Sequence, residues 1–196
     1  MILIDSPYAN IANIARALRA CGAEVQLTSD AEAISRATKI VLPGVGSFAA
    51  AMQWLRERRI DRAIGDAVAG GASLLGICVG HQLLFERSHE MGVTPGLALL
   101  RGEVRALEGP LPVPQIGWNR VQCADDALFA QVAAGTPFYF VHSYAVTNAA
   151  NEIARAEYGL PFTAAVQCGR VFGVQFHPEK SSSAGLQVLR NFVRWN

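Results

Sequence analysis

The sequence has no long hydrophobic run, although 51% of its 196 residues are hydrophobic. Charge, proline or glycine interrupts every stretch of about eighteen residues, so no membrane-spanning helix is expected. The first residues, 1–5, lack the basic region and the small-residue cleavage site of a signal peptide and are typical of a first strand. We therefore expect a cytoplasmic protein that makes no contact with membranes.

A surplus of positive charge is also missing. The formal net charge is +1, and no stripe of Lys and Arg alternates with aromatic residues. The densest charged run, residues 56–59, is typical of a solvated helix face. Binding to nucleic acid is therefore not expected, because it requires a basic surface that neutralises phosphates.

The chain has few cysteines, and none of them form a C-x-x-C pair. The four are widely spaced, which argues against structural zinc and against a disulfide framework; they are Cys21, Cys78, Cys123 and Cys168. Reduced thiols in a reducing compartment are the natural interpretation. We expect neither a metal site nor a cofactor.

The first half of the chain alternates short apolar strands with helices. Strands are expected at 2–4, 25–28 and 39–42 and just before Cys78, and helices at 11–18, at 30–36 and in a long pattern from 48 to about 70. This rhythm predicts a parallel sheet with helices on both faces. No repeat, low-complexity tract or linker occurs, so residues 1–196 are expected to form a single domain.

After residue 85 the pattern changes to short strands with few helices between them. Strands are expected at 103–107, 114–122, 138–146, 153–158 and 162–176, with a hairpin turn at 167–170. A last helix should follow, capped by Ser183. The predicted fold class is α/β: an open, mostly parallel twisted sheet flanked by helices, as in flavodoxin-like folds, with additional antiparallel strands in the C-terminal half.

One stretch combines a strand, a sharp turn and a helix around a cysteine. An apolar run at 72–77 breaks at Gly76-Ile77-Cys78-Val79-Gly80 and resumes at 81–85. Such a bend lifts a nucleophile out of the backbone, and the helix that follows favours the thiolate form of its sulfur. Cys78 is therefore a candidate nucleophile, although a free cysteine more often fills a core.

The partner that this nucleophile needs occurs near the C-terminus. An apolar strand ends at His177, Pro178 blocks its extension, and Glu179 follows. Glu179 could hold one imidazole nitrogen of His177 while the other takes the thiol proton from Cys78. A histidine at a strand end is more often structural, but a neighbouring carboxylate and an elbow cysteine favour catalysis.

Other candidate positions are ambiguous when they are considered alone. The glycine-rich loop 43–48 could expose N–H groups to a ligand, yet a plain turn between strand and helix explains it better. His81 is expected to pack within its helix and His89 to lie on the surface. His142 belongs to an aromatic strand, and its position alone favours the core.

The two motifs Gly76-Ile77-Cys78-Val79-Gly80-His81-Gln82 and His177-Pro178-Glu179 resemble those of the class I, or triad, glutamine amidotransferases. The resemblance implies a glutaminase in which Cys78 attacks the amide of glutamine, His177 is the acid and base, and Glu179 orients it. It further implies an oxyanion hole made by the N–H of Val79 and an N–H of Val45 or Gly46. The residues that cradle glutamine would be Gly44, Gln82, Ser143 and Tyr144.

Within that family, four segments together are similar to the glutaminase subunits of imidazole glycerol phosphate synthases, which act in histidine biosynthesis. The segments are 43–48, 114–119, 139–144 and 177–181. The resemblance implies a heterodimer with a (β/α)8-barrel cyclase subunit that receives the ammonia. It places five residues toward that partner or the ammonia passage, including His142: Asn10, Trp118, Tyr139, His142 and Lys180.

Two departures from the family pattern keep alternatives open. Ser6-Pro7 and Ala9 stand where the family has Tyr-Gly and Gly, and they restrict the backbone before Asn10. His81 replaces a more familiar Met, as in the amidotransferases of anthranilate and aminodeoxychorismate synthases, although the segment around Trp118 argues against that subfamily. A catalytically silent binding subunit is the alternative from another class.

Overall fold

The computed structural model describes residues 1–195, and its main sheet continues through both halves of the chain. Over these residues the sheet has nine strands in the order β2-β1-β3-β4-β13-β12-β11-β8-β9. Strands β2, β1, β3, β4 and β13 are parallel, and the strands beyond β13 are antiparallel. The predicted α/β class, with antiparallel strands in the C-terminal half, is confirmed; the sheet is mixed, because four of its neighbouring pairs are parallel and four are antiparallel.

The strands of this sheet are short in the first half and longer in the second. Their bounds are β1 Ile2–Ile4, β2 Gln26–Thr28, β3 Lys39–Gly44, β4 Ser73–Cys78, β8 Gln115–Cys123, β9 Thr136–His142, β11 Glu152–Tyr158, β12 Leu160–Cys168 and β13 Val171–Val174. A second, four-stranded sheet consists of β10 Tyr144–Ala145, β7 Glu103–Ala106, β5 Arg87–Ser88 and β6 Thr94–Pro95.

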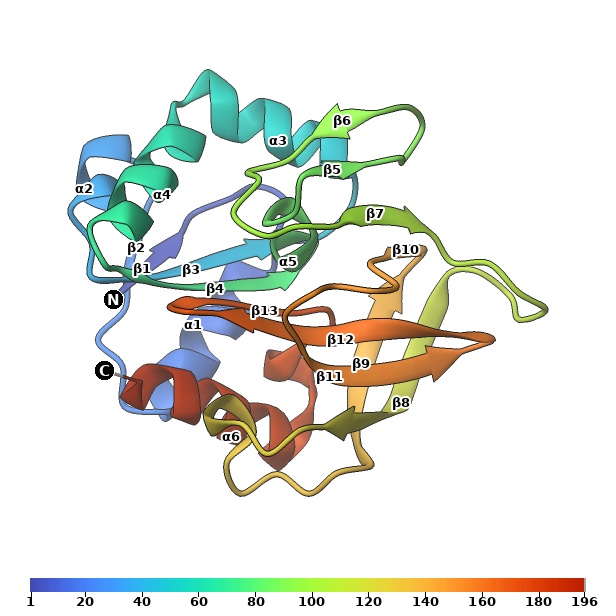
Figure 1. Ribbon diagram of the computed structural model, residues 1–196. Coiled ribbons are helices and arrows are strands. Elements are labelled where there is room, and N and C mark those ends of the chain that lie inside the picture. Colours follow the sequence, from blue (N-terminus) through green and yellow to red (C-terminus); the bar gives the residue numbers. More distant parts are fainter. Residues whose placement is uncertain (196) are drawn as a thin grey trace.

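Helices cover both faces of the parallel half (Figure 1). Helices α1 (Ile11–Ala20) and α6 (Ser182–Arg194) pack together on one face, and α2 (Ala31–Ser35), α3 (Phe48–Glu57) and α4 (Ile60–Ala69) lie on the other. The short helix α5 (Val79–Leu83) follows β4 directly. No helix within residues 1–195 is long and apolar enough to cross a membrane.

Three local expectations from the sequence are corrected. The long helix expected from 48 to about 70 is two helices, because Arg59 adopts φ 57° and breaks the hydrogen-bond ladder between α3 and α4. The strand expected at 138–146 is interrupted at Ser143, between β9 and β10. The last helix begins at Ser182 with Ser181 as its N-cap, so Ser183 lies inside it.

The antiparallel strands curl round until β9 meets the chain that follows β13. The N–H of His177 donates to the carbonyl of Tyr139 at 2.8 Å, and the N–H of Tyr139 donates to Ser181 Oγ at 3.0 Å. Beneath this seam, the rings of Phe138 and Phe176 lie 4.1 Å apart between centroids, and both side chains are fully buried. In the strand order β9 is far from β4, but the curl brings β9 beside the end of β4.

Candidate active site

The registers of three neighbouring strands bring the predicted loop, cysteine and histidine to the same edge of the sheet. Gly44 at the end of β3 lies opposite Cys78 at the end of β4. Ile77 lies opposite Val174 of β13, three residues before His177. The carboxyl ends of parallel strands are where α/β sheets bind ligands.

Cys78 occupies the sharp bend between β4 and α5. Its backbone has φ 55° and ψ −111°, a conformation that is strained for a residue other than glycine. The bend has no room for side chains on its inner side: a Cβ added at Gly80 would lie 1.9 Å from the carbonyl oxygen of Leu42, and one at Gly76 would lie 2.5 Å from that of Gly80. These two glycines are therefore required for β3, β4 and α5 to pack.

His177 and Glu179 form a buried pair. His177 Nδ1 lies 2.9 Å from Glu179 Oε1, and their side chains are 4% and 1% exposed. Burial by itself lowers the pKa of His177, but hydrogen bonds and charge interactions with Cys78 and Glu179 outweigh it and raise the pKa to about 10. The structure thus brings together the sulfur, the imidazole and the carboxylate, with the imidazole in the middle.

The Cys78 sulfur has two further polar neighbours. It lies 3.7 Å from the carbonyl oxygen of Val141 on β9, which can accept a proton from a thiol. It also lies 3.9 Å from Nε2 of Gln175, which can donate to a thiolate. Cys78 therefore has an acceptor for its thiol form, the Val141 carbonyl, and a donor for its thiolate form, the Gln175 amide.

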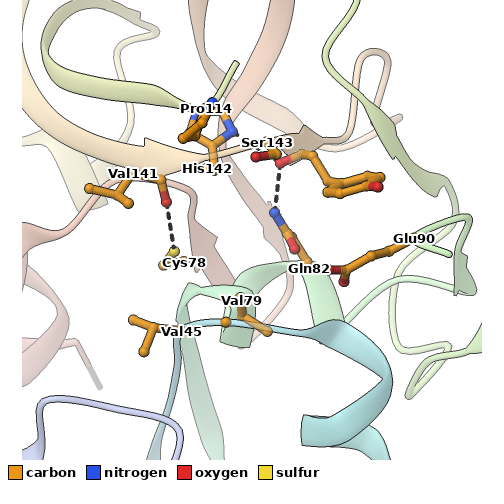
Figure 2. A pocket seen from close by; sticks show the side chains of 11 residues that line it. Val45, Cys78, Val79, Gln82, Glu90, Pro114, Val141, His142 and Ser143 are labelled. Carbon is orange, nitrogen blue, oxygen red and sulfur yellow. Dashed lines mark hydrogen bonds between the residues drawn. The ribbon is translucent and has the colours of Figure 1, made fainter.

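A cavity of about 220 Å³ opens beside the sulfur (Figure 2). Such a volume suits a small ligand, since pockets for drug-sized molecules begin at roughly 300 Å³. Most of the residues expected to bind substrate or oxyanion line it, namely Val45, Gly46, Val79, Gln82, Ser143 and Tyr144. Gly44 is not in this wall; a Cβ added to it would lie 3.0 Å from Gly80 N and from Val79 Cβ, and Gly44 lines a second cavity.

The loop after β3 directs one of its predicted oxyanion donors away from the sulfur. The N–H of Val45 donates to the carbonyl of Tyr8 at 2.6 Å. Val79 is the first residue of α5, where helix N–H groups have no partner within the helix. In this conformation Val79 is available as an oxyanion donor and Val45 is not.

His142 is buried and lines the main cavity, so its expected place at the partner or the ammonia passage stays a prediction. Along β9, residues 138, 140 and 142 point inward while 139 and 141 point the other way, so His142 shares the buried side with Phe140. Its ring contacts the carbonyl oxygen of Tyr144 at 3.0 Å and Gln115 Oε1 at 2.9 Å. Burial lowers its pKa to about 4, so the imidazole is neutral.

The other four residues expected at the partner or passage gather outside the triad. Trp118 is 55% exposed and packs edge-on against the ring of Tyr139, over which Lys180 Nζ lies at 5.6 Å. Asn10 is exposed and lines, with Lys180 and His177, a second cavity of about 120 Å³. This cavity lies on the side of His177 that faces the loop after β3.

His81 packs within the protein as the sequence suggested. It is fully buried, its ring lies edge-on to Phe85 at 5.2 Å, and neither ring nitrogen has a hydrogen-bond partner among residues 1–195. A Cβ at Gly173 would lie 2.3 Å from its Nδ1, so the imidazole fills the space above that glycine. Burial, followed by the charge interaction with His142, lowers its pKa to about 3.

Two residues at the site were not found by sequence reasoning. Glu90, in the loop between β5 and β6, lines the main cavity and accepts a hydrogen bond from the N–H of Phe48 at 2.7 Å. Gln175 stands two residues before His177 and is fully buried. A polar residue inside the apolar segment 171–176 was the available signal for Gln175, whereas nothing in the loop distinguished Glu90. No group of three His, Cys, Asp or Glu side chains suited to a metal occurs in the described chain.

Relatives of known function and solved structures match nearly the whole chain. The chain is 46% identical over 193 residues to the imidazole glycerol phosphate synthase subunit HisH of Moorella thermoacetica, covering 97% of this chain and 92% of that protein. It is also 46% identical over 202 residues to the subunit of the same name from Nocardia farcinica, with 97% and 95% covered.

The fold is similar to that of solved amidotransferases of distant sequence. One crystal structure of a glutamine amidotransferase superposes with a TM-score of 0.77 at 18% identity, covering 97% of this chain and 96% of that one. The structure of PurLQS from Thermotoga maritima gives 0.72 at 21% identity, with 97% and 95% covered. Residues 2–195 match the family described as Glutamine amidotransferase class-I. The chain therefore belongs to the class I glutamine amidotransferases.

Proposed function

We propose that this protein is the glutaminase subunit of an imidazole glycerol phosphate synthase: it hydrolyses glutamine and delivers the ammonia to a cyclase subunit. The observation that carries the proposal is the buried contact of Cys78, His177 and Glu179 beside a cavity sized for a small ligand. The identity of 46% to two subunits of that synthase supports the choice within the family.

The first half of the reaction releases ammonia. The Cys78 thiol loses its proton to His177, and the sulfur attacks the side-chain carbonyl carbon of glutamine. The resulting oxyanion would be held by the N–H of Val79, together with an N–H of Val45 or Gly46 once that loop turns. His177 then gives its proton to the nitrogen, the C–N bond breaks, and ammonia leaves while a thioester remains on Cys78.

The second half restores the enzyme. A water molecule loses a proton to His177 and attacks the thioester carbon. The C–S bond then breaks, His177 returns the proton to the sulfur, and glutamate departs. Glu179 keeps the imidazole oriented through the 2.9 Å contact with Nδ1, which leaves Nε2 to exchange protons with both sulfur and water. The raised pKa of His177 favours the imidazolium form that must donate to the leaving nitrogen.

The polar groups around the cavity indicate how glutamine is oriented. Gln82 Nε2 already donates to the Tyr144 carbonyl at 2.7 Å (Figure 2). It also donates to Gln175 Oε1 at 3.0 Å, so Gln82 can offer a ligand only its Oε1. An acceptor at this position and the carboxylate of Glu90 both suit the α-ammonium group of an amino acid. We infer that the ammonium group of glutamine lies between Gln82 and Glu90.

Replacing Glu90 with glutamine should mainly weaken substrate binding. The change keeps the size of the side chain but removes the charge that faces the ammonium group, so we expect KM for glutamine to rise about tenfold or more with a smaller change in kcat. Steady-state glutaminase assays check this. Glu86→Gln is the matched control, because Glu86 is exposed, does not line the cavity and, like Glu90, accepts a hydrogen bond from a backbone N–H, that of Gly102. Equal effects of the two changes would contradict the role of Glu90.

The partner would bind the face formed by Trp118, Tyr139, Lys180 and Asn10. This face combines exposed aromatic surface with a cation, a composition typical of interface centres. The second cavity joins Asn10 and Lys180 to His177, and would take ammonia from the triad toward the cyclase. A direct passage is needed because ammonia at neutral pH is mostly protonated and is lost to solvent.

The function is tested by mixing the protein with candidate partners and measuring association and products. With a (β/α)8-barrel cyclase subunit and its phosphoribulosyl aminoimidazole carboxamide nucleotide, glutamine should drive formation of imidazole glycerol phosphate. Stable association with a chorismate-using subunit instead would assign the chain to the anthranilate or aminodeoxychorismate synthases. Association with the barrel but no glutamine hydrolysis would indicate a silent binding subunit.

A further inference from the structure

A chain of buried side-chain hydrogen bonds runs from the start of β8 to the nucleophile. Gln175 lies between Gln82 and Cys78 in this series. Its Oε1 accepts a hydrogen bond from Gln82 Nε2 at 3.0 Å, and its Nε2 lies 3.9 Å from the Cys78 sulfur. Gln175 is fully buried and Gln82 is 4% exposed. An amide buried this deeply must have its partners within the protein, because no water can replace them without cost.

The direction of every hydrogen bond in this chain is fixed by one obligate acceptor. The carbonyl of Tyr144 can only accept, so Gln82 must present its NH2 group to it. The second proton of that NH2 group then points at Gln175, which must present Oε1. Gln175 therefore has its own NH2 group facing the Cys78 sulfur, and the opposite orientation would leave two donors facing each other.

The Tyr144 carbonyl also sets the hydrogen-bond directions at His142 and Gln115, at the other end of this series of hydrogen bonds. The Tyr144 carbonyl also faces Nδ1 of His142 at 3.0 Å, so the neutral imidazole carries its proton on Nδ1. Its Nε2 can then only accept, and Gln115 must turn its amide so that the NH2 group donates to it. This pattern applies to neutral His142, the form that its lowered pKa favours.

A donor from Gln175 matters most when Cys78 is ionised. The thiol can donate to the Val141 carbonyl, but a thiolate loses that bond and then faces an oxygen lone pair. The amide of Gln175 supplies a neutral donor on another side, and hydrogen bonds to charged groups are about twice as strong as neutral ones.

The titratable groups around Cys78 are His177 and Glu179 beyond β13, His142 on β9, His81 on α5 and Glu90 across the cavity.

We propose that Gln175 is a positioning residue of the glutaminase reaction: its amide holds the Cys78 sulfur with one end and the substrate-binding Gln82 with the other. The buried amide of Gln175 thereby fixes the positions of both the nucleophile and the side chain that orients glutamine. The inference rests on the proposed function for its catalytic meaning, but the hydrogen bond to the thiolate can be measured without glutamine.

The test is the pH dependence of Cys78 alkylation in Gln175→Met. Methionine conserves the volume of the side chain and removes both ends of the amide. Reaction of the whole protein with iodoacetamide from pH 5 to 9 is followed by mass spectrometry of the peptide that contains Cys78. We expect alkylation at neutral pH to slow about tenfold and its midpoint to rise by about one pH unit, the loss of one hydrogen bond to a charged group. KM for glutamine should rise together with a fall in kcat.

Gln167→Met is the matched control, since Gln167 lies on the neighbouring strand β12 and its amide bonds only to the Gly169 carbonyl. It should keep the alkylation profile of the unmodified protein. A folded Gln175→Met protein with an unchanged profile would overturn the proposal.

Should Gln175→Met fail to fold, Gln82→Met tests the same unit, because it frees Gln175 Oε1. A rise of the alkylation midpoint, smaller than that expected for Gln175→Met, supports the proposal, and an unchanged midpoint contradicts it. Failure of the proposed function is recognised separately: the unsubstituted protein would then show no glutamine hydrolysis with the cyclase, whatever the alkylation profiles.

Discussion

Replacing Cys78 with alanine should abolish glutamine hydrolysis, lowering kcat by about 10⁴-fold or more even in the complex with the cyclase. The substitution removes the atom that forms the thioester, and losses of this size are typical when a covalent nucleophile is removed. The fold should be retained, because alanine leaves the backbone of the elbow between Gly76 and Gly80 unobstructed. Glutaminase assays and thermal unfolding together check both expectations.

Labelling identifies the sulfur independently of turnover. An electrophile that mimics glutamine should form one adduct, on Cys78, and the alanine variant should form none. Cys168→Ala is the matched control, because this exposed cysteine lies beside the first residue of β13, at the end of that strand opposite to His177, and its loss should leave labelling and activity intact. Adducts distributed over Cys21, Cys123 or Cys168 would show that Cys78 is not the nucleophile.

Binding of the cyclase with its nucleotide should raise the glutaminase rate by about 10² to 10³-fold. In the proposed reaction Val45 is a candidate for the second oxyanion donor, and in the free protein its N–H is occupied by the Tyr8 carbonyl. Losing one such donor typically costs about 3 to 4 kcal/mol of barrier, which corresponds to this range of rates. The measurement is glutamate production with and without the partner and its ligand.

The surface that transmits this activation can be located with two exposed apolar residues. Trp118→Ala should weaken association and reduce activation at a fixed partner concentration, because it removes the aromatic centre of the proposed interface. Leu27→Ala, on β2 at the opposite edge of the sheet, is the matched control. Equal rates of the unmodified protein with and without the cyclase would contradict the activation itself.

The sequence predicted the parts of the molecule that depend on local pattern. The apolar strands and the glycines around Cys78 indicated β4 and its elbow, since only this spacing allows the bend to pack beneath Leu42. The apolar run before His177 likewise predicted a strand that leads to this histidine, although β13 ends three residues earlier, at Val174. The role of His177 as the base stays a prediction. The amidotransferase family and its fold were correctly identified from these two motifs.

What the sequence did not reveal depends on contacts between distant segments. The left-handed conformation of Arg59 divides the long helix, and no glycine or proline at this position indicates the break in the sequence. The inward position of His142 agrees with its place in an aromatic strand, but its contacts with Tyr144 and Gln115 depend on how distant strands come together. Glu90 and Gln175 reach the site through contacts with other elements, so neither has a sequence motif of its own.

The seam between β9 and the residues after β13 also affects how the molecule avoids unwanted association. An edge strand with free N–H and C=O groups is a template on which a strand of another chain can assemble into an aggregate. At Tyr139 both groups are already used, by Ser181 Oγ and by the N–H of His177. The segment that carries His177 thus covers the backbone groups of Tyr139 on the last strand of the sheet. A subunit that binds here must therefore contact side chains instead of adding a strand to the sheet.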